Sequence, residues 1–367
     1  MAGLSPLQLM PGAAVPVAGV RMPLAQYLLR GRACTQAPQL LSSLYALCGQ
    51  AHRICAQLAL AALQSPTGLP VQADAPQRLA LWRETLREHV RRMALDWPRL
   101  LRTGAKPDAH TLADLAACPA LQPTLQWRDP ALKAWLAQQV LGMPVEHWLQ
   151  GCQKSPGEWL LQWAHEIRTA SAQQLLAVLP RARAWRPALQ PLGLDAGGAV
   201  LRQLAEAMRA DEQFTSLPQW GGRCLETGCW SRWGETSLQV PDVWTRLAAR
   251  TNDLAHLVQD AEGRWLRAGA LVLDAGEAIA WCEMARGLLV HWLQVDAEGR
   301  IERYAVLAPT EWNFHPQGAA AQVLRELPAS VAPQDIGPAV DLLVAAFDPC
   351  VEHMVVPART QEGMACA

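Results

Sequence analysis

The chain has 367 residues, of which 51% are hydrophobic, and its 32 basic and 33 acidic residues give a formal net charge of -1. This composition excludes a disordered or fibrous protein and suits a large single domain or two ordinary ones. Because the charges nearly cancel, no electrostatic field favours nucleic acid or an anionic membrane as a partner.

Two stretches of the sequence bear on location. The first twenty residues contain prolines and lack a basic region, so they make a poor signal peptide. An uncharged interior stretch, residues 54–73, contains Ser, Thr, Gly and two prolines, which a membrane span would reject. We therefore expect a cytoplasmic protein without membrane insertion.

Periodicity divides the chain into three regions. Residues 24–185 are predicted to be mainly helical, because they are rich in Leu and Ala with apolar positions at helical spacing. Residues 199–345 are predicted to be mixed α/β; short Val-, Leu-, Trp- and Tyr-rich runs alternate with turn residues, and residues 296–299 (DAEG) separate two runs as a hairpin loop does. Residues 346–356 form a separate C-terminal motif. The expected class is a helix-dominated α+β fold with β structure in its C-terminal third, forming one domain over residues 1–367.

Ten cysteines without signs of an oxidising compartment are expected to be reduced thiols. Cys48, His52 and Cys55 stand at i, i+4 and i+7, so one helix face would present all three. Cys350 and His353 lie one turn apart if a helix starts after the preceding proline. Two Cys/His clusters at opposite ends of the chain are compatible with a four-ligand zinc site, whereas the ordinary alternative for each thiol is a small buried core residue.

Three further thiols and one carboxylate complete the candidates. Cys224 and Cys229 have a CxxxxC spacing that fits no common metal site well. Cys34 is close enough in sequence to the first cluster to remain an outside candidate. Asp348, two residues before Cys350, could cap a helix or pair with an arginine.

Three segments together resemble the large subunit of nickel-iron hydrogenases: LCGQAHRIC at 47–55, ARGLLVHWLQVDAEGRIERYAVLAPTEWNFHP at 285–316 and FDPC at 347–350. That family carries a first motif CGxCxxxH, an Arg-Gly segment with a His-Trp pair and a later Trp-Asn, and a last motif DPCxxCxxH. The resemblance is specific in the second and third segments, moderate in the first and absent from the helical middle. It implies a large-subunit-like fold, in which His291 is a packing residue.

The departures from the family motifs carry the functional inference. By this resemblance, Cys48 and Cys350 match the two terminal nickel ligands, whereas Ala51 and His353 stand in place of the two cysteines that bridge nickel and iron. Val356 replaces the final His, after which the enzymes' tails are removed. Hydrogen activation in the family needs all four sulfurs, so the resemblance implies that this chain is not a hydrogenase and that no nickel is bound.

A large-subunit-like chain without the full metal site is similar to the hydrogenase accessory proteins of the HupK/HoxV type. The similarity implies an assembly scaffold or chaperone, not an enzyme, that holds the Fe(CN)2(CO) iron intermediate transiently. Hydrogenase maturation chaperones would deliver this unit, and the hydrogenase large subunit would receive it. Low-spin ferrous iron with cyanide and carbonyl ligands is soft enough for thiolates, and two thiolates give a grip that can be released.

The same resemblance assigns roles to individual residues. Cys48 and Cys350 are the expected iron ligands. Arg286 would lie beside the iron, where its guanidinium could donate hydrogen bonds to a cyanide nitrogen and lower the pKa of a cysteine. Asp348 would orient Arg286 as a supporting partner.

The missing bridging cysteines leave the ligand set open, because in the enzymes these are the residues that touch the iron. Either the two remaining cysteines reach the iron position, or His52, Cys55 or His353 takes part. Three other functions stay open: a metal-free docking adaptor for maturation, a zinc-bearing adaptor, and a divergent hydrogenase-like enzyme.

Overall fold

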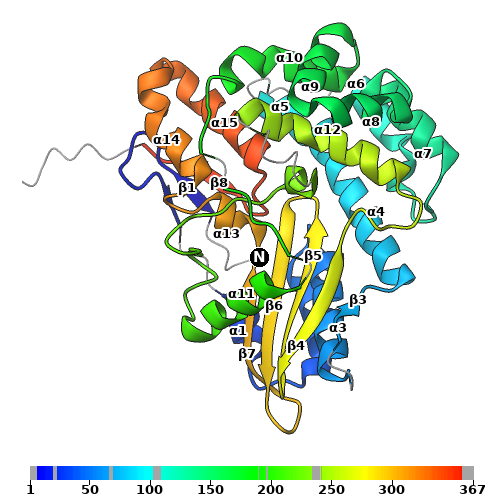
Figure 1. The fold of residues 1–367 in the computed structure, drawn as a ribbon. Coiled ribbons are helices and arrows are strands. Elements are labelled where there is room, and N and C mark those ends of the chain that lie inside the picture. The colour runs from blue at the N-terminus through cyan, green and yellow to red at the C-terminus, as the bar shows by residue number, and fades with distance from the viewer. Residues whose placement is uncertain are drawn as a thin grey trace, which may run out of the picture.

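The computed structural model describes residues 6–19, 23–65, 69–101, 109–188, 190–195, 197–233, 240 and 242–357; the first five residues and the tail with Cys366 lie outside them. A layer of helices lies above one end of a five-stranded sheet, and a small three-stranded sheet lies beside both (Figure 1). In the described part of the chain, no helix combines the length and apolar character needed to cross a bilayer.

The large sheet is antiparallel throughout, and its strands in spatial order are β3 (Val71–Gln72), β4 (Ala268–Asp274), β5 (Glu277–Met284), β6 (Gly287–Val295) and β7 (Ile301–Leu307). The helices in chain order are α1 (Leu24–Leu29), α2 (Ala37–Leu44), α3 (Gly49–Leu63), α4 (Ala75–Arg91), α5 (Trp97–Leu101), α6 (Ala109–Ala116), α7 (Pro130–Trp135), α8 (Val145–Lys154), α9 (Pro156–Glu166), α10 (Ala170–Ala182), α11 (Ala199–Ala210), α12 (Val243–Gln259), α13 (Pro309–Asn313), α14 (Ala319–Ser330) and α15 (Ile336–Phe347).

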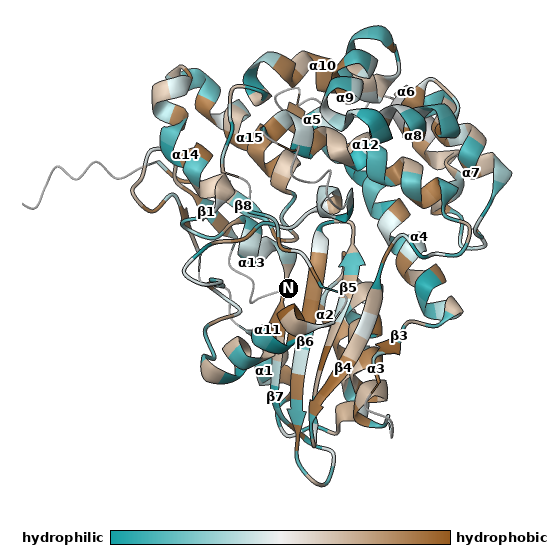
Figure 2. Ribbon diagram, viewed as in Figure 1, coloured by the Kyte–Doolittle hydropathy of each residue, from teal (hydrophilic) through white to brown (hydrophobic). Residues whose placement is uncertain are grey.

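Both faces of the large sheet are covered, which explains why β6 is buried over most of its length. Leu288, Val290 and Trp292 belong to the apolar cluster shared with α11, whereas the alternate residues Leu289 and Leu293 belong to the main core with α3. This alternation follows from the two-residue period of a strand. Figure 2 shows apolar colouring along much of β4 and β6.

Two hairpin turns close opposite ends of β6. The turn at 296–299 that the sequence predicts is confirmed: Asp296 Oδ1 accepts hydrogen bonds from the amides of Glu298 (3.1 Å) and Arg300 (2.7 Å). At the other end, Met284 pairs with Gly287, so a two-residue turn contains Arg286. In Figure 1 this turn lies at the end of the sheet that meets the helical layer. The hairpin thereby carries Arg286 to the boundary between the two layers.

Helix α4 continues into α5 through a π-helical turn, Arg92–Asp96. Pro98 lies in the first turn of α5 and has no amide hydrogen to donate to the preceding turn, so the regular i to i-4 ladder is interrupted there. Arg92 is buried and reaches the segment that follows α15.

The three-stranded sheet joins the two ends of the chain. Its order is β2 (Val17–Ala18), β1 (Leu7–Leu9) and β8 (His353–Val355), and β1 is parallel to β8. The amide of Leu7 donates to the carbonyl of Glu352 (2.9 Å), and the amide of Val356 donates to the carbonyl of Leu9 (2.9 Å). Residues 346–356 are therefore held at both sides of Cys350, by α15 before it and by β8 after it.

Candidate functional site

Cys48 is the N-cap residue of α3 and is 4% exposed. Helix α2 packs closely against this end, since a Cβ at Gly49 would lie 2.7 Å from an α2 backbone oxygen. Glu84, from α4, accepts hydrogen bonds from the amides of Gln50 (2.7 Å) and Ala51 (2.9 Å). A carboxylate from another helix thus satisfies two first-turn amides, and the Cys48 thiol takes no part in capping.

Cys350 lies in an extended segment between α15 and β8. Helix α15 ends at Phe347, Asp348 adopts the left-handed conformation (φ +46°), and the following proline prevents the helix from continuing. Cys350 is half-buried; its amide donates to Thr310 Oγ1 (3.1 Å), and its Sγ lies 3.0 Å from the same oxygen. The helix that would place Cys350 and His353 one turn apart is absent, since bends and then β8 follow Cys350.

The fold brings Cys48 within electrostatic range of Cys350 and Arg286. Burial, and then the nearby Cys350, raise the pKa of Cys48, whereas Arg286 lowers it; the net pKa shift is upward. The expected effect of the arginine is therefore present but is outweighed by desolvation. In the unliganded protein Cys48 is a neutral thiol, and a metal ion must displace its proton to obtain a thiolate.

Arg286 is 3% exposed and is held by two carboxylates. Its Nη2 donates to Glu88 Oε2 (2.9 Å), and its Nε lies 3.7 Å from Asp348 Oδ2, which is too long for a hydrogen bond. Burial acts to lower the pKa of Arg286, but Asp348 and Glu88 raise it further, so the net pKa shift is upward. Arg286 is thus a permanent buried cation, and its Nε has no hydrogen-bond partner in the described chain.

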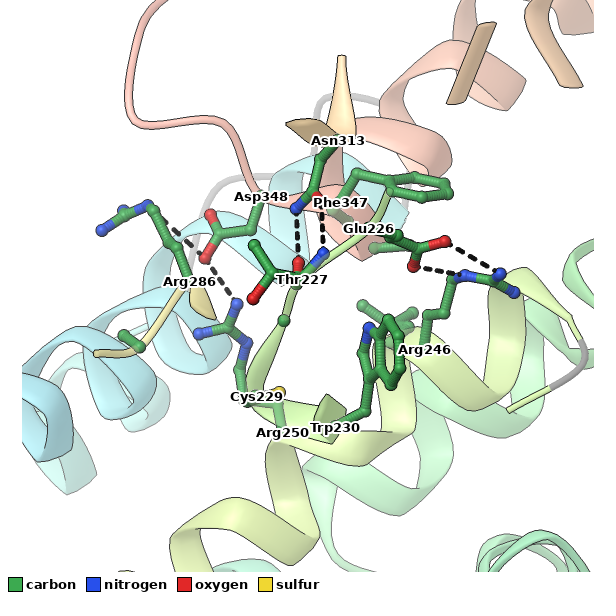
Figure 3. A pocket seen from close by; sticks show the side chains of 15 residues that line it. Glu226, Thr227, Cys229, Trp230, Arg246, Arg250, Arg286, Asn313, Phe347 and Asp348 are labelled. Carbon is green, nitrogen blue, oxygen red and sulfur yellow. Dashed lines mark hydrogen bonds and ion pairs between the residues drawn. The ribbon is translucent and has the colours of Figure 1, made fainter. Parts of the chain in front are cut away.

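Asp348 pairs with three buried arginines, two of which, Arg250 and Arg286, are drawn in Figure 3. Arg92 Nε lies 2.8 Å from Asp348 Oδ1, Arg250 Nη2 donates to Oδ2, and Arg286 is the most distant of the three. Burial acts to raise the pKa of Asp348, but the arginines lower it well below its ordinary value. The carboxylate is therefore ionised at all physiological pH values. It orients Arg286 less directly than expected, because its two short contacts go to Arg92 and Arg250.

Behind Asp348, a buried polar chain fixes Arg250. Arg250 Nη1 donates to His89 Nδ1 (2.6 Å), and His89 Nε2 lies 2.6 Å from Asp253 Oδ2. The arginine donates to Nδ1, so the His89 proton is on Nε2 and is donated to Asp253. Burial and Arg250 lower the pKa of His89 to about 4, so this histidine is neutral. Asp253 also pairs with buried Arg232, and the chain of contacts holds the site from the α12 side.

A small polar cavity of about 20 Å³ lies on the other side of the Arg286 and Asp348 pair. Figure 3 shows Arg246, paired with Glu226 by two hydrogen bonds (2.8 and 3.0 Å), at its border. Arg246 Nη1 has no hydrogen-bond partner within the described chain. The volume is sufficient for one water molecule but not for an iron unit with three diatomic ligands. Neither Cys48 nor Cys350 lines this cavity.

His52 and Cys55 face the sheet. His52 Nδ1 lies 2.9 Å from His291 Nε2, and the His52 ring stacks on Tyr45 at 3.8 Å between centroids. Cys55 Sγ lies 4.0 Å from the carbonyl oxygen of Leu289. His353 lies in β8, where its Nε2 is 3.8 Å from an Asp341 oxygen. These polar groups serve the packing of α3 and the C-terminal segment.

The remaining candidate thiols are dispersed. Cys34 donates its amide to Gly299 at the tip of the β6–β7 hairpin (3.0 Å). Cys224 Sγ lies 3.0 Å from His315 Nδ1, and Cys229 is buried at the wall of the small cavity. Across the described ranges, no group of three or more His, Cys, Asp or Glu side chains is placed to hold a metal ion. Those residues therefore do not form the four-ligand cluster that a structural zinc site needs.

Several site residues were not found by sequence reasoning. Glu84 and Glu88 are one turn apart on an amphipathic helix, where a charged pair is usually solvent-exposed. Thr310 precedes the Trp-Asn pair of the recognised segment, so its position beside that pair was the one available signal. Two of the three arginines around Asp348, Arg250 and Arg92, come from α12 and from the π-helical turn, in parts of the chain where no motif could be read.

A family model described as nickel-dependent hydrogenase matches residues 238–354. The chain is 39% identical, over 362 residues, to the hydrogenase expression/formation protein HoxV of Cupriavidus necator, covering 94% of this chain and 93% of HoxV. The chain belongs to this family of hydrogenase expression/formation proteins. Relatives include HupK of Rhizobium leguminosarum bv. viciae, which is 29% identical over 88% of this chain and 86% of its own length.

Solved structures agree with the expected fold. The chain is similar to an NAD+-reducing [NiFe]-hydrogenase in the H2-reduced state, with a TM-score of 0.54, 15% identity and 91% coverage of both chains. It is also similar to a [NiFeSe] hydrogenase from Desulfovibrio vulgaris Hildenborough, with a TM-score of 0.52, 15% identity and coverage of 91% and 92%. At this identity the likeness shows the fold alone. The predicted large-subunit-like, helix-dominated α+β fold of this HoxV/HupK relative is confirmed.

From the shifted pKa of Glu84 we expect the stability of the protein to depend measurably on pH. Burial raises its pKa to about 7, although the amides of Gln50 and Ala51 oppose the shift; Glu88 also raises the pKa and Arg286 lowers it. The folded protein then binds this proton more tightly than the unfolded chain does. The protonated Glu84 therefore stabilises the folded state fully below about pH 4.5, and this contribution to the free energy of unfolding is lost as the pH rises through 7.

Glu84→Gln imitates the protonated carboxyl group and should remove this pH dependence. The free energy of unfolding of the wild type is expected to fall, relative to the variant, by on the order of 2 kcal/mol between pH 5 and pH 8. Urea unfolding of both proteins at the two pH values measures the difference. Parallel pH profiles would show that Glu84 has an ordinary pKa.

Proposed function

We propose that this chain is an accessory scaffold in hydrogenase maturation, without turnover of its own. It holds the Fe(CN)2(CO) unit as cargo between Cys48 and Cys350, receives it from hydrogenase maturation chaperones and passes it to the hydrogenase large subunit. The observation that carries the proposal is that two thiols from distant parts of the chain lie within electrostatic range of each other and of the buried cation Arg286. The names of the relatives support a role in hydrogenase expression or formation.

The charge balance of the site suits this cargo. Iron(II) with two cyanides and one carbonyl carries no net charge, so the cargo itself adds none. Its binding to two thiolates leaves two negative charges, and Arg286 supplies a compensating positive charge at close range. Arg286 Nε makes no hydrogen bond with the described residues, although it lies 3.7 Å from Asp348 Oδ2, and it is the proposed donor to a ligand nitrogen of the cargo.

The ligand set also suits temporary retention. The resemblance to the enzymes places Ala51 where a bridging cysteine would be, and the backbone amide at this position is bonded to Glu84. Two thiolates without bridging partners hold iron less firmly than four. A scaffold of this kind can therefore bind its cargo and still release it to a site that offers more sulfur ligands.

The runner-up function is a docking adaptor that carries no metal. Two observations favour it: the described residues form no three-ligand group, and the pKa of the Cys48 thiol is raised, which opposes metal binding at neutral pH. Unlike the metal-free adaptor, a zinc-bearing adaptor would contain stoichiometric zinc, and a divergent enzyme would show hydrogen/deuterium exchange activity. Metal analysis and an exchange assay of the purified protein separate the three.

Replacement of Arg286 by Lys tests the cation beside the thiols. Lys keeps the charge but presents no planar fork of donors, and its Nζ cannot reproduce the Nε position. We expect the cyanide bands in the infrared spectrum of the loaded protein to shift, and iron retention during gel filtration to decrease. Arg267→Lys, at the ion pair between exposed Arg267, just before β4, and Glu283, is the control and should change neither. Unchanged cyanide bands in Arg286→Lys would remove Arg286 from the site.

A transfer assay tests the proposed function as a whole. The scaffold is isolated without air from cells that contain the maturation machinery, and it is mixed with a metal-free hydrogenase large subunit. After the two proteins are separated, the CO and cyanide bands should appear on the large subunit and disappear from the scaffold. If the bands stay on the scaffold, or if the large subunit is loaded equally well without it, the chain is not a donor.

A further inference from the structure

We propose that Thr310 is a positioning residue that makes Cys350 the more labile of the two cysteines, so that the cargo leaves from the Cys350 side. The inference rests on the proposed function and deepens it, because it gives the order in which the two sulfurs dissociate from the iron. It arises from a difference between the two thiols that the sequence motifs do not show.

The Thr310 hydroxyl makes two contacts with Cys350. It accepts the hydrogen of the Cys350 amide at 3.1 Å, and it lies 3.0 Å from Cys350 Sγ. A hydroxyl has one hydrogen, and the amide contact does not use it, so this hydrogen is free for the sulfur. When Cys350 is a thiolate it can only accept, and Thr310 must then be the donor. Thr310 is 1% exposed, so water does not compete for this hydroxyl.

The surroundings of Cys48 differ from those of Cys350 in burial and in hydrogen bonding. Cys48 is 4% exposed, whereas Cys350 is half-buried. The Cys48 thiol takes no part in capping α3, where Glu84 accepts the hydrogen bonds of the first-turn amides instead. The two sulfurs therefore have different surroundings: a buried hydroxyl contacts Cys350, while Cys48 lies deeper in the protein.

A hydrogen bond to a coordinating sulfur stabilises the free thiolate and weakens the bond to the metal. In the release step, an acceptor thiolate gives an electron pair to iron as the bond between iron and Cys350 breaks. The pair of that bond stays on the Cys350 sulfur, which then takes a proton from solvent. Iron remains iron(II) and keeps its CO and cyanide ligands. The same exchange at Cys48 completes the transfer.

Thr310→Val tests this assignment, because valine has nearly the same shape and no hydroxyl. We expect the loaded variant to lose its CO and cyanide bands about ten-fold more slowly than the wild type when excess dithiothreitol is added as the acceptor thiol. The CO band should also move to lower wavenumber, since a sulfur without a hydrogen bond donates more electron density to iron. Thr310→Ser restores the hydroxyl and should restore both the release rate and the band position.

Thr251→Val is the matched control. Thr251 lies on α12, is fully buried, and its hydroxyl has no hydrogen-bond partner within the described chain, so its removal should change neither rate nor band. Release from Thr310→Val at the wild-type rate, or faster, would overturn the inference while the CO and cyanide bands still support the scaffold. If the wild type itself shows no such bands, the proposed function fails first.

Discussion

Cys350→Ser is expected to abolish retention of CO- and cyanide-ligated iron while leaving the fold intact. Serine has the same shape, but its hydroxyl does not ionise at neutral pH, and an oxygen ligand suits low-spin iron poorly. Cys350 is half-buried in an extended segment that α15 and β8 hold on either side, so the exchange disturbs little packing. Iron per chain should fall at least about ten-fold, and Cys48→Ser should have the same effect.

Cys224→Ser is the matched control for this experiment. Cys224 is also a half-buried thiol with one polar contact, 3.0 Å from His315 Nδ1, but it lies outside the proposed site. The Cys224→Ser protein should retain iron like the wild type. Infrared spectra and iron analysis of the three variants, together with far-UV circular dichroism to check folding, measure the outcome. A Cys350→Ser protein that keeps its CO and cyanide bands would contradict the two-thiolate site.

Asp348→Asn is expected to lower the free energy of unfolding by roughly 3–5 kcal/mol, because it leaves buried arginines without their carboxylate. Arg92, Arg250 and Arg286 all pair with Asp348 and are at most 8% exposed. Asparagine tolerates the left-handed backbone at this position, so the loss reports on charge and not on conformational strain. Urea unfolding at pH 7 measures the change.

Asp341→Asn provides the comparison on the same helix. Its carboxylate is 31% exposed, and its ion pair with His353 is long, at 3.8 Å, so the expected change is within about 0.5 kcal/mol. An Asp348→Asn protein as stable as Asp341→Asn would mean that the three arginines are neutralised by other groups. The role of Asp348 as the carboxylate that holds these arginines would then be wrong.

The sequence predicted the parts of the fold that depend on local patterns. Alternating apolar runs and the turn at 296–299 predicted β6 and β7, because a strand period and a hairpin turn are local properties. The motif resemblance pointed to Cys48, Cys350 and Arg286 from their place in the chain. The structure puts the three within electrostatic range of one another.

Other features of the site depend on which helix packs where, and no local pattern encodes that. Glu84 reaches the first turn of α3 because α4 packs against it, and Arg92 reaches Asp348 from a π-helical turn in a distant part of the chain. The expected helix after Asp348 failed for a tertiary reason as well: pairing of β8 with β1 draws the segment into an extended conformation.

Infrared spectroscopy combined with iron, nickel and zinc analysis tests the central claim most directly. The protein is purified without air from a host that contains the hydrogenase maturation machinery, and Cys48→Ser is purified beside it. CO and cyanide bands with iron near one per chain, little nickel, and loss of the bands in Cys48→Ser would establish a carrier of the iron unit. A wild-type protein with no such bands, but with intact binding to its partners, would contradict the account and leave a docking adaptor.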